Sequence, residues 1–181
     1  MEKMGTAIGG YAPDFELPGT DGSVHHLFRY LERLQAVGVV FMCNHCPYVR
    51  LYLERLKQIQ TEFQTQGFTL IGINPNDADR YPDDSFENMR EFAEQHQLNF
   101  PYLRDVTQDV AHSFGAEKTP QVFLLNRDGI LCYNGQIDDN ADQPEAVGTA
   151  HFRAAIAQVL SGQPITPTYI PPIGCSIKWR P

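Results

Sequence analysis

Two cysteines, Cys43 and Cys46, stand three positions apart within the stretch VVFMCNHCPYVRLYLERL, residues 39–56. An apolar run precedes the pair and a helical pattern follows it. Three kinds of chemistry fit such a pair: a redox-active dithiol, half of a metal site, or two ordinary buried thiols. Because cysteine reacts as its thiolate, the groups expected around the two sulfurs are the first guide to the choice.

The elements beside the pair predict a reactive sulfur. The apolar, β-branched run VGVVFM at residues 37–42 is typical of a strand buried on both faces. A proline directly after Cys46 suits the first turn of a helix, and Gly67 suits its end. Apolar residues form one stripe along that helix: Val49, Leu53, Leu56, Ile59 and Phe63. The strand would therefore deliver Cys43 to the start of a helix.

Free backbone N–H groups and the positive end of the helix dipole stabilise a thiolate at such a position. We therefore expect the pKa of Cys43 to lie below that of free cysteine. A protonated His45, between the two cysteines, would lower that pKa further and make the pair more oxidising. The alternative for His45 is a solvated loop histidine.

The other two cysteines, Cys132 and Cys175, stand alone in the sequence. A zinc site would need two more ligands at comparable spacing, which isolated cysteines and scattered histidines do not offer. Each lone cysteine is interpreted as a small packing residue. The alternative for Cys175 is a third redox thiol, on a mobile tail, that reaches Cys43.

A second signal is the stretch EKTPQVFLLNRDG, in which Pro120 directly precedes an apolar strand. A proline at a strand start is sterically permitted in the trans form. It could also be cis, as in a tight turn beside a functional site.

Strands and helices alternate along the rest of the chain, which predicts an α/β fold whose mixed central sheet is covered by helices on both faces. The expected elements are a hairpin or arm at 11–27, helices at 27–35, 85–97, 107–115 and 147–162, strands at 68–74 and 100–105, and a hairpin at 121–135. Thr107 is expected to cap the third of these helices. We expect one domain at residues 1–162.

Residues 163–181 form a tail with five prolines. Such a composition argues against a regular element, so we expect the tail to lie over the surface of the domain. Trp179 is expected to hold it there.

The chain has 181 residues, with 22 acidic and 14 basic side chains and a net charge of −8. This charge disfavours nucleic acid and anionic membranes as partners. The N-terminal sequence has no long apolar segment, so we expect a cytoplasmic protein. The acidic stretches YPDDS and IDDNAD are interpreted as solvated loop surface.

Three segments, APDFELPGTDG, VVFMCNHCP and KTPQVFLLNRDGIL, together resemble the thioredoxin fold. More narrowly, they resemble the redoxin branch that includes peroxiredoxins of the AhpC/TSA type, and the tail GCSIKW resembles that of a bacterial subgroup. The resemblance implies that Cys43 is the exposed attacking thiol and Cys46 the buried resolving thiol. It also implies a cis Pro120 facing the pair. The expected substrate-binding residues are Thr119, Pro120, Met42 and Asn44.

The chain departs from thioredoxins in three places. Met42 stands where they carry a tryptophan, and the strand VGVVF lacks their buried aspartate. Val49 stands where some relatives have a glutamate. The proton acceptor for Cys46 is therefore left open between His45 and water.

Thiol–disulfide exchange without a bound cofactor is the function these features favour. Its partners would be protein or small-molecule disulfides and an external thiol as electron donor. One alternative is a thiol peroxidase that reduces hydroperoxides, although Cys43 replaces the threonine that peroxiredoxins place three residues before their reactive cysteine. The other is a Cu(I)-binding protein using Cys43 and Cys46, with a histidine from His45, His112 or His151.

Overall fold

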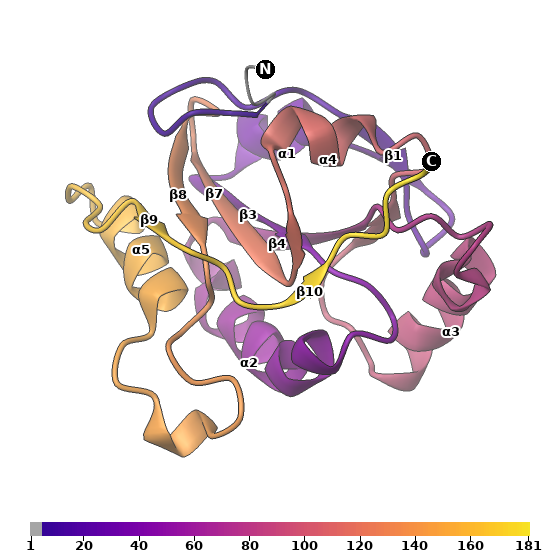
Figure 1. Cartoon of the computed structure of the whole chain (residues 1–181). Helices are drawn as coiled ribbons and strands as arrows, with labels where there is room; N and C mark the ends of the chain where they lie inside the picture. The colour runs from indigo at the N-terminus through magenta and orange to yellow at the C-terminus, as the bar shows by residue number, and fades with distance from the viewer. Residues whose placement is uncertain (1–4) are drawn as a thin grey trace.

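The computed structural model describes residues 5–181 as a central sheet with helices on both faces (Figure 1). Residues 1–4, at the start of the predicted domain, lie outside the described residues. The strands of the central sheet follow the spatial order β5-β4-β3-β7-β8-β9. Their bounds are β3 Ala36–Phe41, β4 Phe68–Asn74, β5 Tyr102–Arg104, β7 Gln121–Asn126, β8 Leu131–Gly135 and β9 Tyr169–Ile170.

Pairing within this sheet is mixed, as predicted. Strand β3 runs parallel to β4 and antiparallel to β7, while β4 and β5 are parallel. Two short antiparallel pairs lie outside the sheet: β1 Glu16–Pro18 with β2 Val24–His26, and β6 Lys118–Thr119 with β10 Cys175–Ser176. The first pair confirms the predicted N-terminal hairpin.

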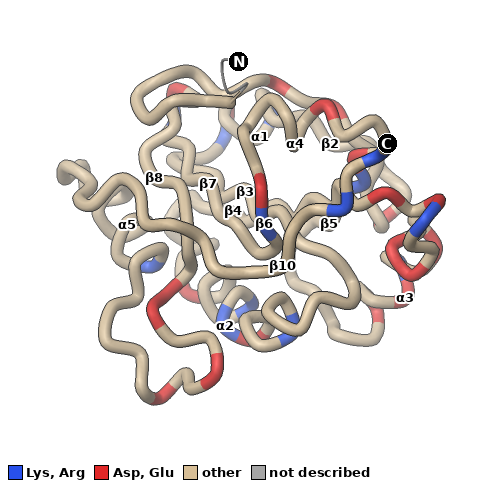
Figure 2. Tube along the Cα trace, viewed as in Figure 1, with Lys and Arg blue, Asp and Glu red and all other residues tan. Residues whose placement is uncertain are grey.

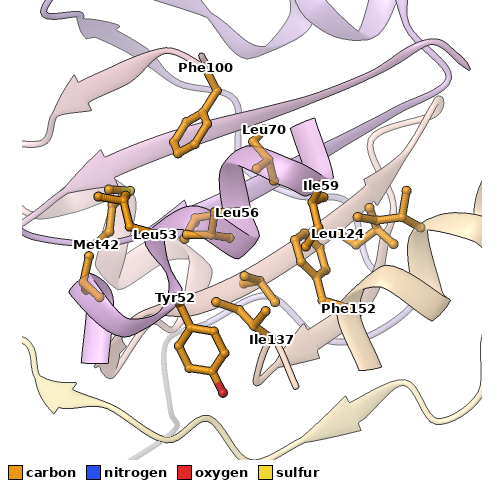
Figure 3. Packing of buried hydrophobic residues seen from close by; sticks show 14 of the residues in the cluster. Met42, Tyr52, Leu53, Leu56, Ile59, Leu70, Phe100, Leu124, Ile137 and Phe152 are labelled. Carbon is orange, nitrogen blue, oxygen red and sulfur yellow. The ribbon is translucent and has the colours of Figure 1, made fainter. Parts of the chain in front are cut away.

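Helices cover both faces of the sheet. The side chains of β3 point alternately to the two faces, so each face has apolar residues that a layer of helices buries. Ala36 and Val40 pack into the core formed with α2 Pro47–Phe63, α3 Phe86–Gln95 and α5 His151–Leu160. Val37, Val39 and Phe41 pack on the other side, against α1 Leu27–Arg33 and α4 Asp109–Phe114. Figure 3 shows Leu53, Leu56 and Ile59 of α2 directed into the first of these cores.

The predicted helix at residues 47–67 begins and ends where expected. Cys46 is its N-cap residue, and Pro47 occupies its first turn. A 3-10 turn, Gln64–Gln66, extends the end of α2, and Gly67 then adopts a left-handed conformation with φ of 83°. Glycine adopts this conformation without steric cost, so the chain can reverse directly into β4.

The predicted cap of α4 is wrong. Gln108, not Thr107, is the N-cap residue, and it has the unusual φ of 67°. Thr107 Oγ1 still accepts a hydrogen bond from the backbone N–H of Asp109. The side chain of Gln108 is committed elsewhere, because its amide group binds the backbone of Pro75, Lys178 and Arg180.

The expectation that the proline-rich tail forms no regular element is also wrong. Its residues 169–170 form β9, which pairs with β8 in the central sheet, and residues 175–176 form β10. Trp179 does hold the tail, because its ring stacks on His112 at a centroid distance of 4.2 Å. Figure 1 shows the tail crossing one side of the molecule between α5 and the C-terminus.

Helices long and apolar enough to cross a membrane are not found in the described part of the chain.

A buried ion pair joins α2 to the loop after β8. Arg55 Nη1 lies 2.8 Å from Asp138 Oδ2, and the two side chains are 12% and 5% exposed. Tyr52 also donates a hydrogen bond to Asp138 Oδ1 at 2.9 Å. Removing one partner of such a pair leaves an uncompensated buried charge.

We expect Asp138→Ala to lower the free energy of unfolding by about 3–5 kcal/mol, because Arg55 loses a buried carboxylate partner. Urea denaturation followed by circular dichroism measures this loss. The matched control is Asp142→Ala, on the same loop but exposed. Equal stabilities of the two variants would contradict the prediction.

Candidate redox site

The CNHC stretch links the end of β3 to the start of α2. Cys43 follows the strand after Met42, and Cys46 caps the helix. Both cysteines are only 4% exposed. The burial expected for Cys46 is therefore observed, whereas the exposed attacking thiol expected at Cys43 is not.

Cys46 is bonded to Cys175 in a disulfide, with the two Cα atoms 6.3 Å apart. Cys43 remains a free thiol, as does Cys132. The interpretation of Cys175 as a packing residue is therefore wrong. The alternative, a tail thiol that reaches the pair, chose the wrong partner, because the bond is made to Cys46 and not to Cys43.

Thr119 lies against both sulfurs of the pair. Its hydroxyl oxygen is 3.5 Å from Cys43 Sγ, and its carbonyl oxygen is 3.2 Å from Cys46 Sγ. The peptide bond between Thr119 and Pro120 is cis, as the resemblance implied. A thiol at position 46, once reduced, could donate a hydrogen bond to this carbonyl.

The other edge of Thr119 pairs with the tail. Cys175 lies opposite Thr119 in antiparallel register, and Ser176 lies opposite Lys118. This is the geometry of β-strand addition, in which an extended peptide joins an exposed strand edge. Thr119 was expected to bind substrate, and in this structure its backbone pairs with the protein's own tail.

The predicted low pKa of Cys43 is wrong for this state of the molecule. Burial raises the pKa of the Cys43 thiol, and the negative charge of Asp84 also raises it. The hydroxyl of Thr119 and the backbone N–H groups of Cys46 and His45 act in the opposite direction. The N–H groups thus converge on the sulfur as predicted, but desolvation of a thiolate outweighs them.

The imidazole of His45 is exposed and lies beside Asp83. Its side chain is 56% exposed, and its Nε2 lies 3.9 Å from Asp83 Oδ1. The group of residue 45 that lowers the pKa of Cys43 is its backbone N–H. The solvated loop histidine, the alternative reading of His45, describes the structure better than the tuning role does.

The carboxylate of Asp84 organises the site. It belongs to the stretch YPDDS, which was expected to be solvated loop surface. Asp84 is 4% exposed. Its Oδ1 accepts hydrogen bonds from the backbone N–H of Asn44 at 2.8 Å and from Asn74 Nδ2 at 3.1 Å. Its Oδ2 accepts a hydrogen bond from Asn76 Nδ2 at 3.0 Å. The neighbouring Asp83 is exposed, so only half of this acidic pair was interpreted correctly.

Met42 and Asn44 were expected to bind substrate, but the structure makes neither side chain accessible. Met42 is fully buried between β3 and α2. Asn44 is 2% exposed, donates to the carbonyl of Asp83 and accepts a hydrogen bond from Tyr102 at 2.8 Å. Their side chains position the cysteine loop from beneath.

Two of these features gave weak signals in the sequence. Asp84 directly precedes Ser85, which caps α3, so the end of an acidic loop is fixed at that point. Cys175 follows a glycine after a run of prolines. Neither signal indicates that Asp84 binds Asn44 or that Cys175 bonds to Cys46.

Within residues 5–181, no group of three or more His, Cys, Asp or Glu side chains is arranged to hold a metal ion. His112, one of the histidines considered for copper, is stacked on Trp179. The copper hypothesis therefore gains no third ligand from the structure.

Comparison with known proteins agrees with this geometry. Residues 8–134 match the family model described as AhpC/TSA family. The thiol-disulfide oxidoreductase ResA of Geobacillus thermodenitrificans is 27% identical over 128 residues, which are 71% of this chain and 68% of that protein.

Two solved structures also resemble the chain. An uncharacterized conserved protein from Geobacillus kaustophilus has a TM-score of 0.90 and 38% identity, covering 97% of this chain and 93% of that one. A thiol:disulfide interchange protein of the thioredoxin family from Chlorobium tepidum has a TM-score of 0.62 at 18% identity, covering 86% and 97%. The second likeness shows the fold alone, which is thioredoxin-like.

In the oxidised protein, we expect iodoacetamide to modify Cys43 more slowly than a free cysteine peptide at the same pH. Burial raises the pKa of this thiol, so a smaller fraction is thiolate and the modification rate rises only at higher pH. Mass spectrometry of the Cys43 peptide across a pH series gives the midpoint. A midpoint at or below that of the free peptide would contradict the expectation.

Asp84→Asn should shift the midpoint of Cys43 modification to lower pH, because the charge of Asp84 raises the pKa of Cys43. Asp83→Asn is the matched control, since this adjacent carboxylate is exposed, with 74% of its side chain accessible. The same pH series measures both variants, and thermal melting verifies that each is folded. Equal shifts in the two variants would rule out a specific effect of Asp84.

Proposed function

Because this chain belongs to the AhpC/TSA family, we propose that Cys43 and Cys46 are the redox pair of a thiol–disulfide oxidoreductase. The chemistry is supported by the curated relative, which is named a thiol-disulfide oxidoreductase.

One observation carries the proposal: Cys46 is bonded to a cysteine that sits on a strand paired with Thr119. The site therefore already holds an extended, cysteine-containing segment against the redox pair. A substrate segment that paired with the same edge would bring its own disulfide to the two sulfurs.

Exchange proceeds in two balanced steps. The Cys43 thiolate attacks one sulfur of the substrate disulfide, forming a mixed disulfide and releasing the other substrate sulfur as a thiolate that takes up a proton. The Cys46 thiolate then attacks Cys43 Sγ, and the second substrate sulfur leaves. The substrate gains two electrons, and Cys43 and Cys46 lose two in forming their disulfide.

The groups around the pair favour this order of events. The backbone N–H groups of His45 and Cys46 stabilise negative charge on Cys43. Their effect dominates only when the sulfur is hydrated, so Cys43 becomes the nucleophile once water reaches it. Thr119 would then offer its free backbone edge to the substrate.

We further propose protein or small-molecule disulfides as substrates and an external thiol as electron donor. A role in reducing disulfides fits the cytoplasmic location expected from the sequence, where thiols are kept reduced. Reduction of hydroperoxides is the competing activity for the same cysteines.

Cys46→Ser should accumulate mixed disulfides through Cys43, because the resolving thiol is missing, whereas Cys43→Ser should accumulate none. Each reduced variant is incubated with excess oxidised insulin-chain disulfide and analysed on non-reducing gels and by mass spectrometry. Cys132→Ser serves as the control and should behave as wild type, because this free thiol has no part in the proposed exchange.

The reverse trapping pattern would exchange the roles of Cys43 and Cys46, and trapping in neither variant would remove both. Reduced wild-type protein is treated in parallel with the disulfide substrate or with an equal dose of hydrogen peroxide. Oxidation of the reduced pair faster by peroxide than by the disulfide substrate would favour the peroxidase instead.

A further inference from the structure

We propose that Cys175 is a third redox-active residue. After each exchange its thiolate attacks the Cys43–Cys46 disulfide and forms a disulfide with Cys46, which frees Cys43. We call this transfer the relay. This inference rests on the proposed function, because it assigns the step that follows formation of the Cys43–Cys46 disulfide. It accounts for the arrangement observed here, with Cys46 bonded to Cys175 and Cys43 free.

The tail is shaped to bring Cys175 to this place. Gly174 packs so closely on Thr119 that a Cβ atom at position 174 would overlap the Thr119 carbonyl oxygen. Any residue other than glycine would push the tail off the edge of β6. The Gly-Cys sequence is thus a steric requirement for seating the sulfur of Cys175 on Cys46.

Contacts beyond the cysteine hold the tail independently of the disulfide. The backbone N–H of Lys178 donates to Asn76 Oδ1 at 3.0 Å, and its carbonyl accepts from the N–H of Asp77 at 2.8 Å. The amide of Gln108 binds the backbone of Lys178 and Arg180.

Apolar contacts reinforce this anchor. Ile177 is 3% exposed and belongs to the core on the α1 and α4 side of the sheet. Trp179 stacks on His112 of α4. With the tail fixed on this side, reduction of the disulfide would leave Cys175 near Cys46 at a high effective concentration.

Before the anchor, the tail is free of charge. Residues 162–177 contain no Asp, Glu, Lys or Arg, which appears as an unbroken tan stretch reaching β10 in Figure 2. Ion pairs therefore do not fix this stretch. The short pairing of β10 with β6 can open when the Cys46–Cys175 disulfide is broken. The same edge of Thr119 would then be open to a substrate.

The relay moves the disulfide to a cysteine that is more exposed than Cys43 and Cys46. Cys43 and Cys46 are buried, while Cys175 is of intermediate exposure. While the tail is paired with β6, an external thiol cannot readily reach a disulfide between two buried sulfurs, since exchange needs access to the attacked sulfur. Moving the bond to Cys175 presents one accessible sulfur to the electron donor.

The relay step changes no oxidation state. The Cys175 thiolate attacks Cys46 Sγ, the Cys46–Cys175 bond forms, the Cys43–Cys46 bond breaks, and Cys43 leaves as a thiolate that takes up a proton. A dithiol donor then attacks Cys175 Sγ, and Cys46 leaves. The second thiol of the donor releases Cys175, so that the donor is oxidised and all three protein thiols are reduced.

The test follows the bonds after one oxidation cycle. Fully reduced protein is treated with one equivalent of oxidised insulin-chain disulfide, free thiols are blocked with N-ethylmaleimide, and the cysteine peptides are mapped without reduction. We expect Cys46–Cys175 with Cys43 blocked in the wild type, and Cys43–Cys46 in Cys175→Ser. Reduction of the oxidised protein by dithiothreitol should be about tenfold slower in Cys175→Ser, because the disulfide of that variant joins two buried sulfurs.

Gly174→Val separates seating of the tail from the presence of the thiol. It keeps Cys175 but blocks the approach to Thr119, so its oxidised form should contain Cys43–Cys46, as in Cys175→Ser. Ile173→Ala, at the exposed neighbouring position, is the matched control and should give the wild-type bond. Thermal melting of the reduced proteins verifies that the variants are folded.

Two results would overturn the relay. The first is a wild-type product with Cys43–Cys46 bonded and Cys175 blocked, which would leave the proposed function intact. The second is a Cys46–Cys175 bond that stays unreduced through several rounds of substrate reduction, which would make it a structural disulfide and would also remove Cys46 from the proposed redox pair. If wild-type protein reduces no disulfide at all, the proposed function fails and the relay fails with it.

Discussion

The arrangement of this molecule depends on one close approach, that of Thr119 to the N-terminus of α2. The hydroxyl and the carbonyl of this single residue contact the two sulfurs of the CNHC stretch, and its remaining edge pairs with the tail. The central sheet makes the approach possible, because β3, which leads to Cys43, lies beside β7, which follows Pro120.

The electrostatics of the site come from a competition between two effects of the fold. Helix-end N–H groups point at Cys43 and favour its thiolate, while burial of the sulfur and the charge of Asp84 disfavour it. In this structure desolvation prevails, so Cys43 is a protected thiol. A site of this kind gains reactivity by uncovering a sulfur, without any change in the residues around it.

Support for the cysteine loop comes from buried polar groups that do no chemistry themselves. Asp84, Asn44 and Tyr102 form a connected set of hydrogen bonds beneath Cys43. Buried polar groups of this kind are costly unless every partner is present, so they fix one conformation of the loop. The tail is held by the same region, since Asn76 binds both Asp84 and Lys178.

Local pattern determined much of this protein. Apolar runs, helix stripes and glycine or proline punctuation predicted the mixed sheet, the helix that starts at Pro47 and the hairpin of β7 and β8, because these depend on neighbours a few residues apart. The spacing of Cys43 and Cys46 on a strand-to-helix turn predicted a dithiol site for the same reason.

Only the tertiary structure decided how that site is covered and connected. Cys175 meets Cys46 across 129 residues of sequence, and no periodicity or spacing encodes such a contact. The burial of Cys43, Asn44 and Asp84 likewise depends on segments that are distant in the chain. A side chain's pKa and accessibility are set by everything packed around it, whereas local sequence reports only the element on which it lies.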